Sequence, residues 1–188
     1  MGYPLLEAHE RACTAFQALA DRVPDDRWDA PTPCSEWDAR ALVEHVIGFH
    51  EFLVIRPLGA RARRPKDGSP ADRWRATADT LLAALGEPGA LDRDIDLPGG
   101  GTTRLRGLVP SLTNDVIAHT WDLARATGLD TEIDPELVAR AYAIASSDAS
   151  FGAGDDMFDP AVPVADDADD LTKLVALYGR DPAWSPPG

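Results

Sequence analysis

Apolar residues recur every three or four positions along most of this chain, and proline or glycine interrupts each run. This spacing is the period of an α-helix that buries one face. Alternation of apolar and polar residues, which is typical of a half-buried strand, is almost absent. The helices predicted from the spacing are residues 4–23, 32–55, 70–85, 108–127, 135–149 and 169–179.

Residues that favour helix ends lie at the borders of these segments. Ser35 is predicted to cap the second helix, with Asp38 as the acid of a capping box. Ser69 followed by Pro70 is the order of an N-cap and a first helical residue. Gly128 follows the fourth predicted helix and is a typical C-terminal signal. The borders therefore support the helices that the spacing predicts.

Only residues 90–106 break this pattern. They contain short alternating patches around three consecutive glycines, so they form either a long loop or a small hairpin. Long amphipathic helices joined by loops predict a mostly α fold, an antiparallel four-helix bundle with additional C-terminal helices. A chain of 188 residues is long enough for one buried core and short for two, so residues 1–188 are expected to form a single domain.

The charge balance excludes some classes of partner. The chain has 18 basic and 32 acidic residues, a net charge of -14, which argues against binding to a phosphate backbone. Basic residues gather at 61–66, which we interpret as a solvated loop. No apolar run reaches the roughly 20 residues of a membrane span. Because the N-terminus also has no signal-peptide layout, the expected location is the cytoplasm, and the sequence is equally compatible with a monomer or a homodimer.

Two cysteines, Cys13 and Cys34, do not make a disulfide framework. Neither has a second cysteine three positions away, so the sequence argues against a thiolate metal site. Both are predicted to be reduced and structural.

The stretch DVIAHTWD, residues 115–122, places three functional side chains on one helical face. Asp115, His119 and Asp122 are four and three positions apart, so a helix brings an imidazole between two carboxylates. Either this is the polar edge of an amphipathic helix, or the side chains are aimed at a metal ion. Asp122 also fits a supporting role in which it fixes the tautomer of an imidazole.

A metal site needs a further ligand, and the other histidines are His9, His45 and His50. His45 and His50 are separated by about 140° on a regular helix, so only one of them is expected to reach the face of His119. We choose His45, whose neighbours are typical of buried positions, and interpret His9, beside Glu10, as a surface histidine.

Two readings of this set stay open. Two imidazoles and one carboxylate from facing helices of a bundle, with an open fourth position, are typical of catalytic zinc. A histidine on an apolar helical face is also commonly a core residue bonded to a polar neighbour. No nucleophile elbow, phosphate-binding loop or dinucleotide fingerprint is present in the sequence.

Three motifs resemble those of a known family: TPCSEWDARALVEHV at 32–46, DVIAHTWDLARATG at 115–128 and YGRDPAW at 178–184. They are similar to actinobacterial proteins related to the N-terminal, metal-binding domain of mycothiol-dependent maleylpyruvate isomerase, in the DinB/YfiT-like superfamily. The resemblance spans about residues 5–184. It implies a DinB-like four-helix bundle.

The resemblance also implies a divalent metal, most often zinc. The family's ligands are a histidine of the second helix, matched here by His45, and a glutamate and a histidine one turn apart on a later helix. His119 matches the last of these, and Asp115 stands where the family has glutamate. Aspartate is one methylene shorter, so its reach toward a shared ion is smaller.

The resemblance favours one function over an alternative. Other members of the superfamily are thiol S-transferases, so we expect a metal-dependent thiol transferase or isomerase that uses mycothiol or a similar small thiol and a small-molecule electrophile. The isomerase has an additional C-terminal domain, so maleylpyruvate isomerisation itself is not expected. The alternative is a non-catalytic binding or stress-response protein that keeps the bundle and has lost the chemistry.

Overall fold

The computed structural model describes residues 4–97, 100–147 and 159–186. Six α-helices occur in this part: α1 (Leu5–Ala20), α2 (Ala39–His50), α3 (Pro70–Gly86), α4 (Leu105–Thr127), α5 (Pro135–Ser147) and α6 (Asp170–Leu177). Single turns lie at η1 (Asp25–Arg27), η2 (Glu51–Ile55) and η3 (Ala90–Asp92), and two strands at β1 (Asp94–Asp96) and β2 (Thr102–Arg104). The predicted mostly α fold is confirmed. Positions 148 and 149 of the predicted fifth helix lie outside the described residues.

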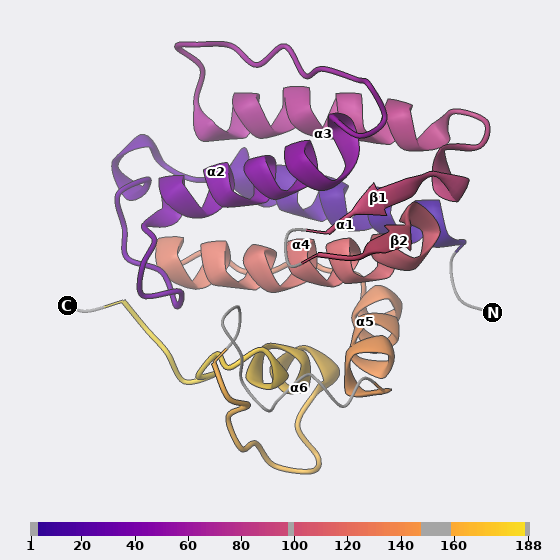
Figure 1. The fold of residues 1–188 in the computed structure, drawn as a ribbon. Helices are drawn as coiled ribbons and strands as arrows, with labels where there is room; N and C mark the ends of the chain where they lie inside the picture. The colour runs from indigo at the N-terminus through magenta and orange to yellow at the C-terminus, as the bar shows by residue number, and fades with distance from the viewer. Residues whose placement is uncertain (1–3, 98–99, 148–158, 187–188) are drawn as a thin grey trace.

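The first four helices form the bundle (Figure 1). Helices α1 and α2 each pack against both α3 and α4. The loop at 56–69 returns along the length of the bundle, so α2 and α3 run in the same direction while α1 and α4 run opposite to them (Figure 1). Helices α5 and α6 pack against each other below α4. The bundle therefore places α2 and α4, which carry the predicted site, side by side.

Local signals explain where the helices start. Ser69 is the N-cap of α3 and Pro70 its first helical residue, as predicted, and Asp72 completes a capping box that was not predicted. The prediction for α2 is wrong in one respect. Its N-cap is Asp38, whose carboxylate accepts from the backbone N–H of Ala41 at 2.7 Å, and Ser35 lies in the preceding loop. The carboxylate of Asp38 reaches the orphan N–H groups of the first turn directly, so Ser35 has no capping role.

The segment 90–106 contains a small hairpin, which decides between the two alternatives for this region. Strands β1 and β2 are antiparallel, and Ile95 pairs with Thr103. Ile95 is 1 % exposed, while its neighbours Asp94 and Asp96 face solvent. One buried side chain therefore fastens the hairpin to the bundle near the start of α4.

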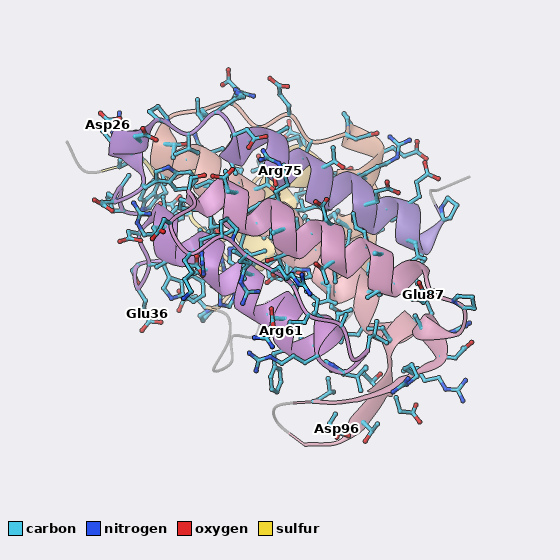
Figure 2. The ribbon with its side chains drawn as sticks, turned by 90° about the horizontal axis from the view of Figure 1, so that it is seen from above. Asp26, Glu36, Arg61, Arg75, Glu87 and Asp96 are labelled. Carbon is cyan, nitrogen blue, oxygen red and sulfur yellow. The ribbon has the colours of Figure 1, made fainter. Side chains whose placement is uncertain are left out.

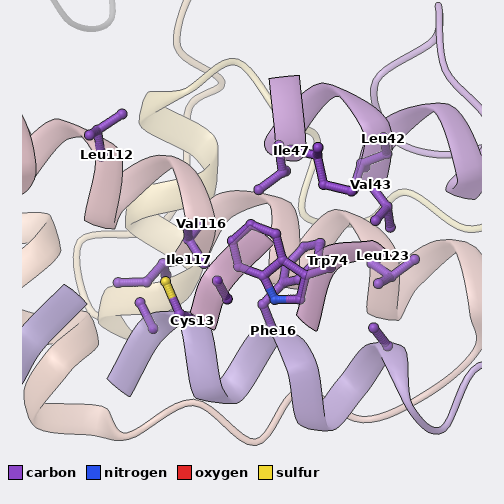
Figure 3. Close-up of a cluster of buried hydrophobic side chains, with 14 of the residues drawn as sticks. Cys13, Phe16, Leu42, Val43, Ile47, Trp74, Leu112, Val116, Ile117 and Leu123 are labelled. Carbon is purple, nitrogen blue, oxygen red and sulfur yellow. The ribbon is translucent and has the colours of Figure 1, made fainter. Parts of the chain in front are cut away.

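The core of the bundle surrounds the indole of Trp74 on α3 (Figure 3). Phe16 of α1 meets this indole edge to face, with ring centroids 5.1 Å apart. Aliphatic side chains of α2 and α4, including Ile47 and Val116, surround the two rings. Burial of such side chains stabilises the fold by about 1.5–3 kcal/mol each relative to exposure.

Most charged side chains lie on the outside of the molecule, as the six labelled residues in Figure 2 do. One arginine of the predicted solvated loop at 61–66 departs from this pattern: Arg64 is only 24 % exposed and forms an ion pair with the buried carboxylate of Glu51. Within the described residues, no helix is both long and apolar enough to cross a membrane.

Candidate metal centre

Helices α2 and α4 bring His45, Asp115 and His119 together. The rings of His45 and His119 have centroids 5.1 Å apart and meet edge to face. His119 Nε2 lies 3.4 Å from Asp115 Oδ1. One ligand atom from each of the three residues lies within 4.8 Å of the others. The two imidazoles thus come from different helices and reach one small site, as the sequence predicts.

The donors fit a divalent cation in chemistry, and one pair of them also fits in spacing. Zinc bonds of about 2.0–2.2 Å in a tetrahedron separate neighbouring ligand atoms by roughly 3.3–3.6 Å, and the 3.4 Å between Asp115 and His119 falls in this range. Asp115 is 13 % exposed, and its Oδ2 atom has no hydrogen-bond partner among the described residues. A buried carboxylate oxygen without a partner is costly unless a ligand or ion satisfies it.

Asp122 holds the other nitrogen of His119. Its Oδ2 lies 2.9 Å from His119 Nδ1, and the carboxylate is fully buried. Donation of the Nδ1 proton to Asp122 leaves Nε2 facing Asp115 and His45, which is the orientation that a ligating histidine needs. The structure therefore places Asp122 where its predicted supporting role requires it.

Aromatic side chains form the wall around His45. The indole of Trp37 stacks on this imidazole with centroids 4.1 Å apart, and Phe49 lies on it at 5.8 Å. Trp37 is also 5.9 Å from the ring of His119. Trp37 was not predicted as a site residue: the sequence places it inside the predicted helix 32–55, whereas it lies in the loop before α2. Trp121, in contrast, is a packing residue, with the guanidinium of Arg125 5.2 Å from its ring.

Burial and neighbouring charges shift the pKa values of both histidines in the site, in opposite directions. Burial opposes a charge on His119, but the carboxylates of Asp115 and Asp122 outweigh it and raise the pKa of His119 well above its usual value. Burial and the neighbouring His119 lower the pKa of His45 to about 4. His45 is therefore neutral near pH 7, with a nitrogen lone pair available to a cation.

Two further residues join the site from distant parts of the sequence. Cys34 Sγ lies 3.3 Å from Asp122 Oδ2, and Arg180 Nη2 donates to that sulfur at 2.8 Å. Cys34, His119 and Asp122 form a second group of closely spaced donor atoms. Cys34 is a free cysteine, and its position beside Asp122 and Arg180 was not predicted from the sequence. Burial raises the pKa of its thiol, so Cys34 is a thiol that donates to Asp122.

His9 is fully buried, which corrects its interpretation as a surface histidine. Thr113 Oγ1 donates to Val109 O at 2.8 Å, so it accepts from His9 Nδ1 at 3.1 Å. His9 Nε2 is then the acceptor toward the thiol of Cys13, 3.7 Å away. These partners come from α4 and from the next turn of α1, so the adjacent Glu10 gave a misleading signal.

His50 is also fully buried, and its ring contacts lie on α1 and α3. Its ring stacks on His9 at 5.4 Å and contacts Trp74, and its Nδ1 donates to Val46 O at 2.8 Å. Of the two histidines, His45 is the one whose ring meets that of His119, although His50 is the more buried. The angle of about 140° between them on the helix explains why the two rings have different neighbours: His45 contacts Trp37 and His119, and His50 contacts His9 and Trp74.

Comparison with known proteins identifies the family to which this chain belongs. Residues 9–124 match the family model of the mycothiol maleylpyruvate isomerase N-terminal domain. Two uncharacterized proteins of Mycobacterium tuberculosis, from strains CDC 1551 / Oshkosh and ATCC 25618 / H37Rv, are each 38% identical over 143 residues. The alignment covers 74% of this chain and 76% of each relative.

The fold resembles the crystal structure of the mycothiol-dependent maleylpyruvate isomerase with a TM-score of 0.57 and 13% identity. The match covers 76% of this chain and 70% of that one, and a histidine-to-alanine mutant of the isomerase gives the same values. The segment matched by the family model contains His45, Asp115, His119 and Asp122. The chain therefore belongs to the mycothiol maleylpyruvate isomerase N-terminal domain family.

Proposed function

We propose that this protein is a divalent-metal-dependent thiol transferase or isomerase, with zinc as the metal and mycothiol or a similar small thiol as cosubstrate. The observation that carries the proposal is the convergence of His45, Asp115 and His119, together with the unpartnered buried oxygen of Asp115. Three protein ligands leave one position open to an exogenous group. The family's name supports the choice of mycothiol.

Each residue of the site has a distinct role in this proposal. His45 and His119 supply neutral nitrogen ligands from α2 and α4, and Asp115 supplies negative charge. Asp122 orients His119 by accepting its Nδ1 proton at 2.9 Å. Trp37 and Phe49 cover the side of His45 and limit the access of water to it. A zinc ion held there would lower the pKa of an incoming thiol and direct the thiolate toward an electrophile.

Metal analysis of protein purified without chelators tests the ligand set. We expect about one zinc per chain in the wild type and strong depletion in His119→Ala. His9→Gln is the matched control, because His9 is an equally buried histidine outside the ligand set, and it should retain the metal. Equally negligible metal in the wild type and His119→Ala would refute the proposal. Anomalous scattering at the zinc edge, from crystals grown without added metal, locates the ion independently.

Activity is tested by turnover of chlorodinitrobenzene with mycothiol, before and after removal of the metal by a chelator. Restoration of activity by added zinc supports the proposal. The alternative of a non-catalytic binding protein is favoured by one observation: a protonated His119 between Asp115 and Asp122 balances charge without any ion. If that alternative holds, the wild type binds no metal, and added zinc produces no turnover.

A further inference from the structure

Arg180 lies directly behind the candidate site, although it is far from the other site residues in the sequence. Its side chain is 11 % exposed, and its Nη2 and Nε atoms lie 3.0 and 3.3 Å from the two oxygens of Asp122. Nη2 also contacts Cys34 Sγ, and Nη1 donates to Tyr178 O at 2.9 Å. Arg180 thus contacts both carboxylate oxygens of the residue that orients His119. It lies outside residues 9–124, which the family model matches.

The end of α6 fixes the position of Arg180. Gly179 adopts a left-handed conformation with φ 79°. The backbone N–H of Gly179 donates to Ala176 O, and that of Arg180 donates to Val175 O, both at 3.0 Å. This pair of hydrogen bonds is the Schellman motif, which ends the helix. The yellow C-terminal segment then continues past the end of α6 toward the loop before α2 (Figure 1).

The role of this arginine follows from the hydrogen bonds and the positive charge that the buried carboxylate of Asp122 needs. The carboxylate is fully buried and accepts hydrogen bonds from His119, Arg180 and Cys34. A buried carboxylate that loses its cationic partner either reorients or recruits water, because an uncompensated buried charge is strongly unfavourable. A guanidinium fork also fixes the carboxylate plane, which a single ammonium group does not. The angle at which Asp122 receives the His119 proton thus depends on Arg180.

We propose that Arg180 is a positioning residue of the metal centre: it locks the carboxylate of Asp122, which in turn aims His119 Nε2 at Asp115 and His45. The inference rests on the proposed function, since Arg180 acts, through Asp122, on a ligand of the proposed metal. It makes the C-terminal segment after α6 part of the site.

Zinc affinity, measured by competition with a chromophoric chelator, tests the proposal. Arg180→Gln should weaken zinc binding by about 10-fold or more, the usual effect of removing support from a ligating histidine, and Arg180→Lys should recover part of the loss. The matched control is Arg106→Gln on α4, whose exposed ion pair with Asp92 is remote from the site. It should stay within about twofold of the wild type.

A double-mutant cycle shows whether Arg180 acts through Asp122. Because the arginine works on zinc only by way of that carboxylate, Asp122→Asn combined with Arg180→Gln should bind zinc about as tightly as Asp122→Asn alone. Losses that multiply in the double variant would show an independent role and overturn the proposal. Wild-type affinity in Arg180→Gln would overturn it as well.

Proton NMR of the metal-free protein gives a readout that does not need zinc. The His119 Nδ1–H bond to Asp122 should give a slowly exchanging downfield imidazole resonance, identified by its absence in His119→Ala. We expect this resonance to be lost or shifted in Arg180→Gln, partly restored in Arg180→Lys and unchanged in Arg106→Gln. An unchanged resonance in folded Arg180→Gln contradicts the proposal. Absence of zinc binding in the wild type would instead refute the proposed function, so the two failures are distinguishable.

Discussion

At the scale of single residues, the two aspartates of the candidate site differ in how their carboxylate oxygens are satisfied. Asp122 is buried, and each of its carboxylate oxygens has a hydrogen-bond partner. Asp115 contacts His119 through Oδ1, whereas its Oδ2 has no hydrogen-bond partner among the described residues. Buried carboxylate oxygens are normally paired, so an Oδ2 of Asp115 without a partner in the described part of the chain is compatible with the cation that we propose there.

Asp115 should therefore be required for metal binding through its charge. We expect Asp115→Asn to weaken zinc binding at least about tenfold, because an amide oxygen is a neutral and poorer ligand than a carboxylate. Asp115→Glu keeps the charge and should keep zinc binding. Isothermal titration at one pH and ionic strength compares the three proteins. Equal affinities of the wild type and Asp115→Asn would exclude Asp115 as a ligand.

The buried His9 predicts an acid-sensitive fold. Burial and the neighbouring His50 lower the pKa of His9 to about 3, against 6.5 when exposed. Between these values the unfolded chain binds the proton and the folded chain does not, so stability is complete above pH 6.5 and falls as the pH decreases toward 3. The loss from this one group is about 2 kcal/mol between pH 7 and pH 5.

Urea unfolding of the wild type and His9→Gln at pH 7 and pH 5 measures this loss. Every other titrating group is common to both proteins, so the difference between their pH dependences isolates His9. The wild type should lose more stability on acidification than the variant. The same loss in both would show that His9 is protonated without unfolding.

Individual residues also show which parts of the candidate site could be predicted from the sequence and which could not. Asp115 and His119 were proposed as ligands because helical spacing puts them on one face, and His45 because its neighbours are typical of buried positions. Cys34 and Arg180 were missed because 88 and 58 residues, respectively, separate them from Asp122, and local pattern carries no information on such contacts. The burial of His9 likewise depends on Thr113, which is 104 residues away.

At the scale of elements, boundaries were predicted best where one local signal dominates. Ser69 and Pro70 at α3, and Gly128 after α4, lie where the sequence placed them. The start of α2 was misassigned because Ser35 and Asp38 are both good N-caps, and spacing alone does not choose between them. The π-helical turn η2 after His50 was not predicted, since its side chains have the same apolar character as those of a regular helix.

The start of α2 can be tested with two matched substitutions. Asp38→Ala should destabilise the protein by about 1 kcal/mol, because it removes the acceptor of the Ala41 N–H. Ser35→Ala, in the same loop, should stay within about 0.5 kcal/mol of the wild type. Denaturant unfolding gives both values. The opposite order would return the capping role to Ser35.

At the scale of the whole molecule, the bundle holds the ligands on two helices that are separated in sequence by the long return loop and α3. A cation bound by His45 on α2 and by Asp115 and His119 on α4 would therefore connect separate parts of the fold. Since the unfolded chain does not keep these residues together, such an ion binds the folded state and stabilises it by mass action.

Zinc should accordingly raise the melting temperature of the protein. A free zinc concentration 100 times the dissociation constant adds about 2.7 kcal/mol, which for a domain of this size corresponds to roughly 5–11 °C. Excess chelator should abolish the shift. His9→Gln should show the full shift relative to its own metal-free melting temperature, whereas His119→Ala should show little. An equal shift in His119→Ala would place the ion elsewhere, on the acidic surface that a net charge of -14 provides, because only an ion at the α2–α4 site depends on that imidazole.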